Sequence, residues 1–157
     1  MNWGTLVATV LGAVVGVSST LIVDRVRWRR DRATSSAVER RQLYGQFLGA
    51  VIATRMNLSK LLRDEECRPD ERGRRASNVL HSGGVYELRY QIMITAPAAV
   101  VAGVEESFQT LRSIRDQVAE GQTPGSNTYV QARERHRKAT SKLTSAMREE
   151  LSNHPGV

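Results

Sequence analysis

The distribution of charged residues divides this chain into two parts. Residues 3–23, WGTLVATVLGAVVGVSSTLIV, contain no charged side chain, whereas charged residues recur throughout the rest of the sequence. A helix of this length, rising about 1.5 Å per residue, crosses the hydrocarbon core of a bilayer. Only two residues precede the apolar run, and it ends in LIVDRVRWRR, which is not typical of a cleaved signal peptide. We therefore predict an uncleaved transmembrane helix at residues 3–23.

Small side chains recur at every fourth position of this predicted span. Residues four apart lie along one side of a helix, so they form a shallow ridge that another backbone can approach closely. Close packing of this kind is a principal way in which helices associate in lipid. We predict a helix-association face that contacts either a second copy of the chain or another membrane protein. Its residues are Gly4, Ala8, Gly12, Gly16 and Thr20.

The segment that follows the span, residues 24–32, is rich in arginine. Arginines cluster on the cytoplasmic side of membrane helices, and indole rings suit the headgroup region. We therefore expect a single-pass protein of the cell membrane, with residues 1–2 outside and the remaining domain in the cytoplasm. The residues expected at the membrane surface are Arg25, Arg27, Trp28, Arg29, Arg30 and Arg32.

Apolar residues recur at intervals of three and four between Ala33 and Arg63, which predicts an amphipathic helix. Its expected buried positions are Ala37, Tyr44, Phe47, Leu48, Val51, Met56, Leu58 and Leu62. The stretch RDEECRPDERGRRAS follows, with balanced charges, a proline and a glycine. This composition predicts an exposed loop, in which Cys67 is a surface thiol.

The chain after Asn78 contains a shorter segment with apolar residues at helical spacing. Its expected buried positions are Val85, Leu88, Ile92 and Ala96. The letters YQIMIT are also compatible with a strand, so both structures stay open here.

The clearest helix outside the predicted span follows, with Thr95 as a candidate N-cap, Pro97 in the first turn and Gly121 as the terminator. Its expected buried residues are Val100, Val104, Phe108, Leu111 and Val118. Asn127 is a candidate cap for a last helix. The expected buried stripe of that helix is Tyr129, Ala132, His136, Ala139, Leu143, Ala146 and Glu150. We expect His136 to be a hydrogen-bonded polar position inside the fold.

These elements predict an all-α fold. Four amphipathic helices with short connections pack most simply as an up-and-down bundle, which we assign to residues 33–152. Residues 153–157 are expected to be a frayed tail. The predicted architecture is an N-terminal transmembrane helix followed by a small cytoplasmic helical bundle.

The formal net charge of +7 does not by itself indicate a nucleic-acid ligand. Much of it comes from the arginines after the span, which also attract anionic lipid headgroups. The basic residues lack the zinc spacing, helix-turn-helix signature or interleaved aromatics of nucleic-acid binders, so the sequence argues against that class. The histidines and Cys67 show no metal-ligand spacing, and we predict no metal and no cofactor.

One pair of residues raises an enzymatic alternative. In RASNVLH, Arg75 precedes His81 by six residues. This spacing resembles the arginine and histidine of HEPN ribonucleases, which are dimeric helical bundles. The resemblance implies that His81 would move a proton while Arg75 stabilised phosphate charge. Ala76 stands where that family has a polar residue.

Two longer stretches resemble a different group. WGTLVATVLGAVVGVSSTLIVDRVRWRRD and GVYELRYQIMITAPAAVVAGVEESFQTLRSIRD are similar to segments of small, uncharacterised, single-pass membrane proteins of actinobacteria. The resemblance implies an anchor with a helical cytoplasmic domain and carries no catalytic residues. We therefore expect a non-enzymatic interaction or scaffold protein. A membrane-tethered HEPN-like ribonuclease and an anionic-lipid binder are the alternatives.

Overall fold

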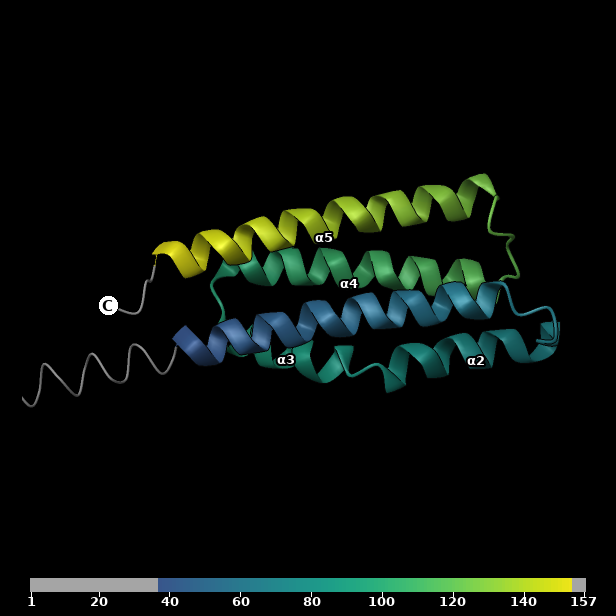
Figure 1. Cartoon of the computed structure of the whole chain (residues 1–157), viewed down its shortest axis with the longest axis horizontal. Helices are drawn as coiled ribbons and strands as arrows, with labels where there is room; N and C mark the ends of the chain where they lie inside the picture. Colours follow the sequence, from purple (N-terminus) through teal and green to yellow (C-terminus); the bar gives the residue numbers. More distant parts are fainter. Residues whose placement is uncertain (1–36, 154–157) are drawn as a thin grey trace, which may run out of the picture. The chain divides into compact units, whose positions relative to one another are not determined.

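The computed structural model describes residues 37–153, and every regular element within that range is a helix (Figure 1). A first helix covers residues 37–62. It is followed by α2 (Pro69–Ser82), α3 (Val85–Thr95), α4 (Ala98–Ala119) and α5 (Asn127–Asn153). None of these described helices combines the length and apolar character needed to cross a membrane. The predicted span, its ridge of small residues and the arginines of residues 24–32 lie outside the described range.

Helices α4 and α5 run antiparallel along their whole length. The Oγ of Ser107 lies 3.3 Å from the Oγ1 of Thr140. Further along α4, the Oγ1 of Thr110 lies 3.0 Å from the Nδ1 of His136, which precedes Thr140 in α5. Gly103 makes close contact possible nearer the start of α4, because a Cβ there would lie only 3.0 Å from Leu143.

Helices α2 and α3 follow one another along the other side of α4. Gly73 of α2 adjoins Ala119 at the end of α4, whereas Arg89 of α3 pairs with Glu105 near its start. The two helices therefore make one arm of the bundle, antiparallel to α4, with a break at the two glycines between them. Gly84 has a φ of +69°, a left-handed conformation that glycine adopts without steric strain.

The helix at residues 37–62 closes the bundle. It is antiparallel to α5, since Arg40 pairs with Glu150 at one end and Ser59 hydrogen-bonds Tyr129 at the other. Its Thr54 also faces Gly83 at the break between α2 and α3. The four arms are thus the 37–62 helix, α2 with α3, α4 and α5, and successive arms run in opposite directions (Figure 1). This arrangement confirms the predicted helical bundle.

Apolar side chains from all four arms fill the centre of this bundle. Burial of such side chains is the main source of stability in a helical domain. The largest fully buried ones are Tyr44, Phe47, Leu58, Leu80, Ile92, Leu111, Ile114 and Leu143. The buried stripe predicted for α4 is confirmed, and the terminator Gly121 has the left-handed φ of +73°.

The predicted loop between Arg63 and Ser77 is wrong over most of its length. Only residues 63–68 are non-helical, and α2 begins at Pro69. Proline suits the first turn of a helix. The negative charges of Asp70 and Glu71 in that turn interact favourably with the helix dipole. Asp70, Arg74 and Arg75 are exposed on α2, while Ala76 and Leu80 are buried. Cys67, expected at the surface, is only 3% exposed.

Several predicted positions also require correction. Met56 is 49% exposed, and Leu61 is buried instead, because the inward face of the 37–62 helix follows Leu58, Leu61 and Leu62. Thr95 does not cap α4; it is the last residue of α3, where its hydroxyl donates to the Gln91 carbonyl.

At the other boundaries, the YQIMIT stretch is helical within α3. Ser126, rather than Asn127, accepts a hydrogen bond from an amide of the first turn of α5, that of Tyr129. In α5, Met147 is buried, whereas Ala146 is only partly so. The helix also continues through Asn153, one residue into the predicted tail.

Candidate functional site

The two residues of the enzymatic alternative lie on different faces of α2. Positions six apart on a helix are separated by about 120° around its axis. The guanidinium of Arg75 points toward the loop after the 37–62 helix, where it pairs with Asp64 at 3.1 Å. The ring of His81 instead stacks on Tyr86 of α3, with ring centroids 5.0 Å apart and planes 6° from parallel. The fold therefore does not bring Arg75 and His81 together.

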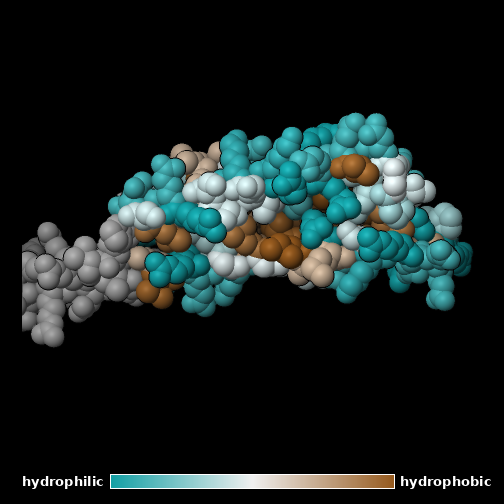
Figure 2. All heavy atoms as spheres, turned by 45° about the horizontal axis from the view of Figure 1, so that its top comes forward, coloured by the Kyte–Doolittle hydropathy of each residue, from teal (hydrophilic) through white to brown (hydrophobic). Residues whose placement is uncertain are grey.

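A groove lies between α5 and the 37–62 helix, and we call it the α5 groove. It encloses about 670 Å³. Figure 2 shows apolar surface in the middle of this side of the bundle, bordered by hydrophilic side chains. The residues lining the α5 groove are Ile52, Arg55, Val130, Arg133, Glu134, His136, Arg137, Thr140, Ser141 and Thr144.

Apolar side chains contribute to the α5 groove from both of its helices. Ile52 is 47% exposed on the 37–62 helix. Val130 is 48% exposed on α5. Isolated exposed apolar residues are common, but a set that lines one concave surface is typical of an interaction site.

The charge of the α5 groove is mainly positive. Three arginines and one glutamate line it. Arg137 is neutralised by that glutamate, Glu134, through hydrogen bonds of 2.7 and 2.9 Å. Arg55 and Arg133 have no carboxylate partner within residues 37–153, although Arg133 lies over the ring of Tyr129. Two guanidinium groups are therefore available to an anionic ligand.

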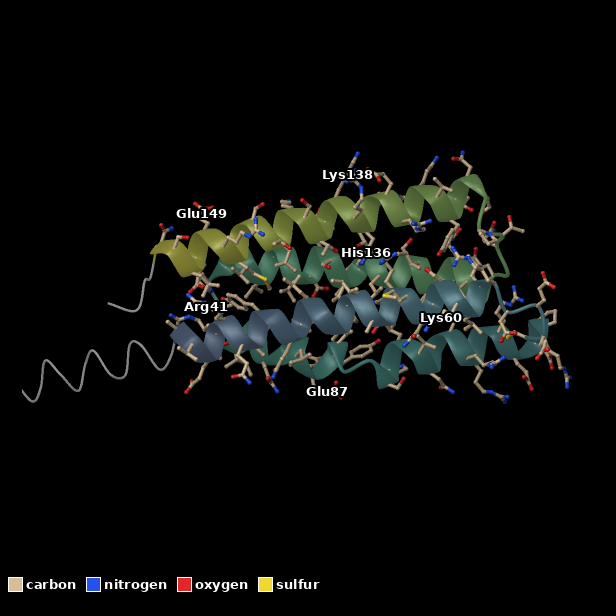
Figure 3. The ribbon with its side chains drawn as sticks, in the orientation of Figure 1. Arg41, Lys60, Glu87, His136, Lys138 and Glu149 are labelled. Carbon is tan, nitrogen blue, oxygen red and sulfur yellow. The ribbon has the colours of Figure 1, made fainter. Side chains whose placement is uncertain are left out.

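His136 forms the inner wall of the α5 groove. It is only 3% exposed, and Figure 3 shows it on the inner side of α5, whereas Lys138 points away from the bundle. Its Nδ1 lies 3.0 Å from the hydroxyl of Thr110 in α4. Burial, with a contribution from the charge of Arg55, lowers the pKa of His136 from 6.5 to about 4. The prediction of a buried, hydrogen-bonded histidine is confirmed, and the imidazole is neutral at pH 7.

A second polar cluster connects the 37–62 helix and α5 at one end of the bundle. Arg40 pairs with Glu150 at 3.1 Å, and both side chains are largely buried. Tyr44 lies beside them, and burial together with the Glu150 carboxylate raises the pKa of Tyr44 to about 12. Sequence periodicity placed Tyr44 and Glu150 on the inner faces of their helices, but the partner Arg40 carried no such signal.

Within residues 37–153, no group of three or more His, Cys, Asp or Glu side chains is placed to hold a metal ion. Comparison of the chain with family models, with curated proteins and with solved structures finds no match. The case for a function therefore depends on the α5 groove and on the sequence.

Proposed function

We propose that this chain is a membrane-anchored, non-enzymatic interaction protein whose α5 groove binds an acidic, amphipathic segment of a partner protein. The observation that carries the proposal is the combination of exposed apolar side chains with two unneutralised arginines in one groove. The predicted span would hold this groove close to the cytoplasmic face of the membrane. The groove would then select partners that reach the same surface.

The apolar part of the α5 groove suits a helix rather than an extended chain. Ile52 and Val130 line the groove from its two helices, and the exposed Met56, four residues after Ile52, extends the apolar surface on the same side of the 37–62 helix. An amphipathic helix places its own apolar residues at the same intervals of three and four. Such a helix can therefore lay its apolar stripe along the groove, which is a common mode of peptide recognition.

The arginines supply the charge preference. A guanidinium group binds a carboxylate through two parallel hydrogen bonds, so Arg55 and Arg133 favour aspartate and glutamate on the partner. Charge complementarity of this kind mainly sets specificity and the rate of association. A basic helix would be repelled by the same two side chains.

The geometry of the enzymatic alternative is less favourable. A general acid or base must lie within hydrogen-bond reach of the proton that it moves, beside the group that stabilises the developing charge. Arg75 and His81 face different ways, and each has a partner of its own. These placements support the interaction protein over a ribonuclease built on that pair.

The ridge Gly4, Ala8, Gly12, Gly16 and Thr20 extends the proposal to the membrane. If it joins two copies of the chain, two α5 grooves are held within one complex. Linked grooves bind a multivalent partner more tightly than a single groove does, with no new contact needed.

The test uses full-length protein in nanodiscs of zwitterionic lipid. The probe is a fluorescein-labelled helical peptide with a leucine stripe flanked by glutamates, and its partner peptide carries lysines in place of the glutamates. We expect saturable binding of the acidic peptide only, measured by fluorescence anisotropy. Arg55→Glu together with Arg133→Glu should weaken binding by about tenfold or more, since two charge pairs become repulsive.

The matched control is the pair Arg135→Glu and Arg148→Glu. Both arginines are exposed on α5 but do not line the α5 groove, so the net charge changes equally while the groove is intact. Equal losses for both double variants would overturn the proposal, because binding would then follow net charge alone. Binding of a single-stranded RNA that is lost with Arg55 and Arg133, without binding of the acidic peptide, would also overturn it.

A further inference from the structure

Helix α3 buries apolar residues on its inner face, and it also exposes large apolar side chains beside the exposed Glu87. Val85 and Ile92 are fully buried against the rest of the bundle. On the outer face, Tyr90 is 57% exposed, Met93 41% and Ile94 85%. Three large apolar side chains so close together on one exposed face are unusual for a surface in water.

The outer face of α3 continues into a turn without charge. Residues 92–104, IMITAPAAVVAGV, contain no acidic or basic side chain. Pro97, Ala98 and Ala99 in the turn are all exposed. We call Tyr90, Met93, Ile94 and the exposed turn residues 97–99 the α3 edge.

The α3 edge lies toward the end of the bundle at which the chain enters the domain. Arg40, near the start of the described chain, pairs with Glu150 near the end of α5. Gly103 in α4 adjoins Leu143 in that same part of α5, so the turn between α3 and α4 belongs to this end as well (Figure 1). The opposite end carries the loops at residues 63–68 and 120–126.

The predicted span ends at Val23, and residues 24–36 connect it to this end of the bundle. Thirteen residues reach about 45 Å when fully extended and about 20 Å as a helix. The α3 edge is therefore within reach of the bilayer that the predicted span would cross.

We propose that the α3 edge inserts into the interfacial layer of this same bilayer. The proposal rests on the anchor of the proposed function, but not on the α5 groove. Tyrosine is enriched at the headgroup level because its ring is apolar and its hydroxyl is polar, which suits Tyr90. The adjacent Arg89 is neutralised by Glu105 at 2.7 Å, so no unpaired charge on that arginine opposes insertion. The exposed Glu87, one turn before Tyr90, would have to lie at the polar headgroup level.

A second copy of the chain is a less suitable occupant of the α3 edge. Stable protein interfaces bury about 800 Å² on each partner, contributed by about 20–30 residues. The whole of α3 has 11 residues, of which only three large apolar side chains are exposed outward. A membrane contact needs less area, because the anchor already holds the edge near the lipid at high effective concentration.

This placement leaves the α5 groove accessible. The arm of α2 and α3 contacts α4 and the 37–62 helix, whereas α5 lies on the other side of these two arms. With the α3 edge in the interfacial layer of the bilayer, α5 would face the cytoplasm. The membrane contact would thus orient the groove toward partners.

The test measures depth in the full-length protein in nanodiscs. Ile94→Cys is labelled with bimane, and quenching by brominated lipids is compared with that of Gly125→Cys in the loop at the opposite end. We expect quenching about threefold stronger at Ile94, because the quencher acts only within the lipid and its interfacial layer of about 5–10 Å. Wild-type protein, whose buried Cys67 is its only cysteine, measures background labelling.

A label at Val14→Cys separates this proposal from that of the anchor. If Val14 is quenched and Ile94 is no more quenched than Gly125, the membrane contact of the α3 edge is wrong and the anchor stands. If neither Val14 nor Ile94 is quenched, both proposals fail. Quenching at Ile94 without quenching at Val14 would support the contact and overturn the anchor.

A second pair of variants checks that the exposed apolar side chains cause the contact. With the label at Ala98→Cys, Ile94→Glu should reduce lipid quenching about threefold or more, because an interfacial carboxylate is costly to dehydrate. Gln131→Glu, on the exposed surface of α5, is the matched control and should leave quenching unchanged. Unchanged quenching in Ile94→Glu would contradict the proposed insertion.

Discussion

The second arm of the bundle, α2 with α3, and the fourth arm, α5, flank α4 in the same antiparallel manner but are built differently. Helix α5 runs without interruption for 27 residues, buried on one face and polar on the other. The second arm is broken at Gly83 and Gly84, between a mainly polar α2 and an α3 that exposes large apolar side chains as well as burying others. One packing geometry therefore accommodates one long helix or two short helices in series.

The difference between these arms concerns their outer faces more than their inner ones. A continuous amphipathic helix such as α5 exposes polar residues along its full length, which suits contact with water and with a charged ligand. The break allows the outer faces of α2 and α3 to differ in polarity, while the inner faces of both helices pack on α4. The outer face of α3 can then be apolar without affecting that of α2.

The largest expected effect concerns the buried histidine of α5. Because burial lowers the pKa of His136 from 6.5 to about 4, protonation favours the unfolded chain. The contribution of His136 to stability is thus complete above pH 6.5 and falls as the pH decreases toward 4. The expected loss over this window is up to about 3 kcal/mol.

Guanidinium unfolding of the full-length protein in mild detergent, followed by circular dichroism, measures this loss. His136→Gln keeps a hydrogen-bonding side chain but does not titrate, so its stability should change less over the same window. The matched control is His81→Gln in α2, which makes the same change at an exposed position and shows whether the effect is specific to His136. Parallel pH curves for wild type and His136→Gln would contradict the prediction.

The next effect concerns the break in the second arm. A Cβ at Gly83 would overlap the hydroxyl of Thr54 in the 37–62 helix, and Thr54 is only 1% exposed. We expect Gly83→Ala to lower the free energy of unfolding by about 2 kcal/mol through overpacking.

Thr54→Ala tests the cause of this loss, because it removes the overlapping hydroxyl. The double variant with Gly83→Ala should be more stable than Gly83→Ala alone, as measured by the same unfolding titration. An equal loss in the single and the double variant would show that the Gly83 contact is not responsible.

The smallest effect compares two glycines of the second arm. Gly73 lies inside α2 with room for a Cβ, whose nearest neighbour would be Ala119 at 3.9 Å. Gly73→Ala should therefore stabilise the domain by about 0.5–1 kcal/mol, because alanine has the higher helix propensity.

Gly84→Ala is the contrasting control, since Gly84 has a positive φ. It should destabilise the domain by about 1 kcal/mol although nothing crowds the position. Changes of the same sign in both variants would show that local backbone conformation does not distinguish the two sites.

The sequence was most informative where apolar residues were large and regularly spaced. Val104, Phe108 and Leu111 mark the inner face of α4, and all three are buried as predicted. The sequence was least informative for α2, because its stretch is rich in charge and contains only two fully buried residues, Ala76 and Leu80. A helix with so narrow an inner face resembles a loop in composition and becomes apparent only when packed on α4.

The candidate site was predictable only in its parts. The spacing of apolar residues in α5 placed His136 on its inner face. Neither the hydrogen bond of His136 to Thr110 nor its proximity to Arg55 follows from that spacing. The α5 groove joins two helices that are far apart in sequence, and Ile52 looked no different from any other isolated apolar residue. Arg75 and His81 were close in sequence, yet the helical turn separates them.

By itself, the sequence determined the all-α class, the inner faces of α4 and α5 and the terminator at Gly121, because these depend on residues near one another along one helix. Only the tertiary structure decided that α2 and α3 form one arm, that Met56 faces outward and that Arg55 and Arg133 share a groove. The physical reason is that such features depend on which helices pack together, and a long-range contact of this kind is not expressed in local periodicity.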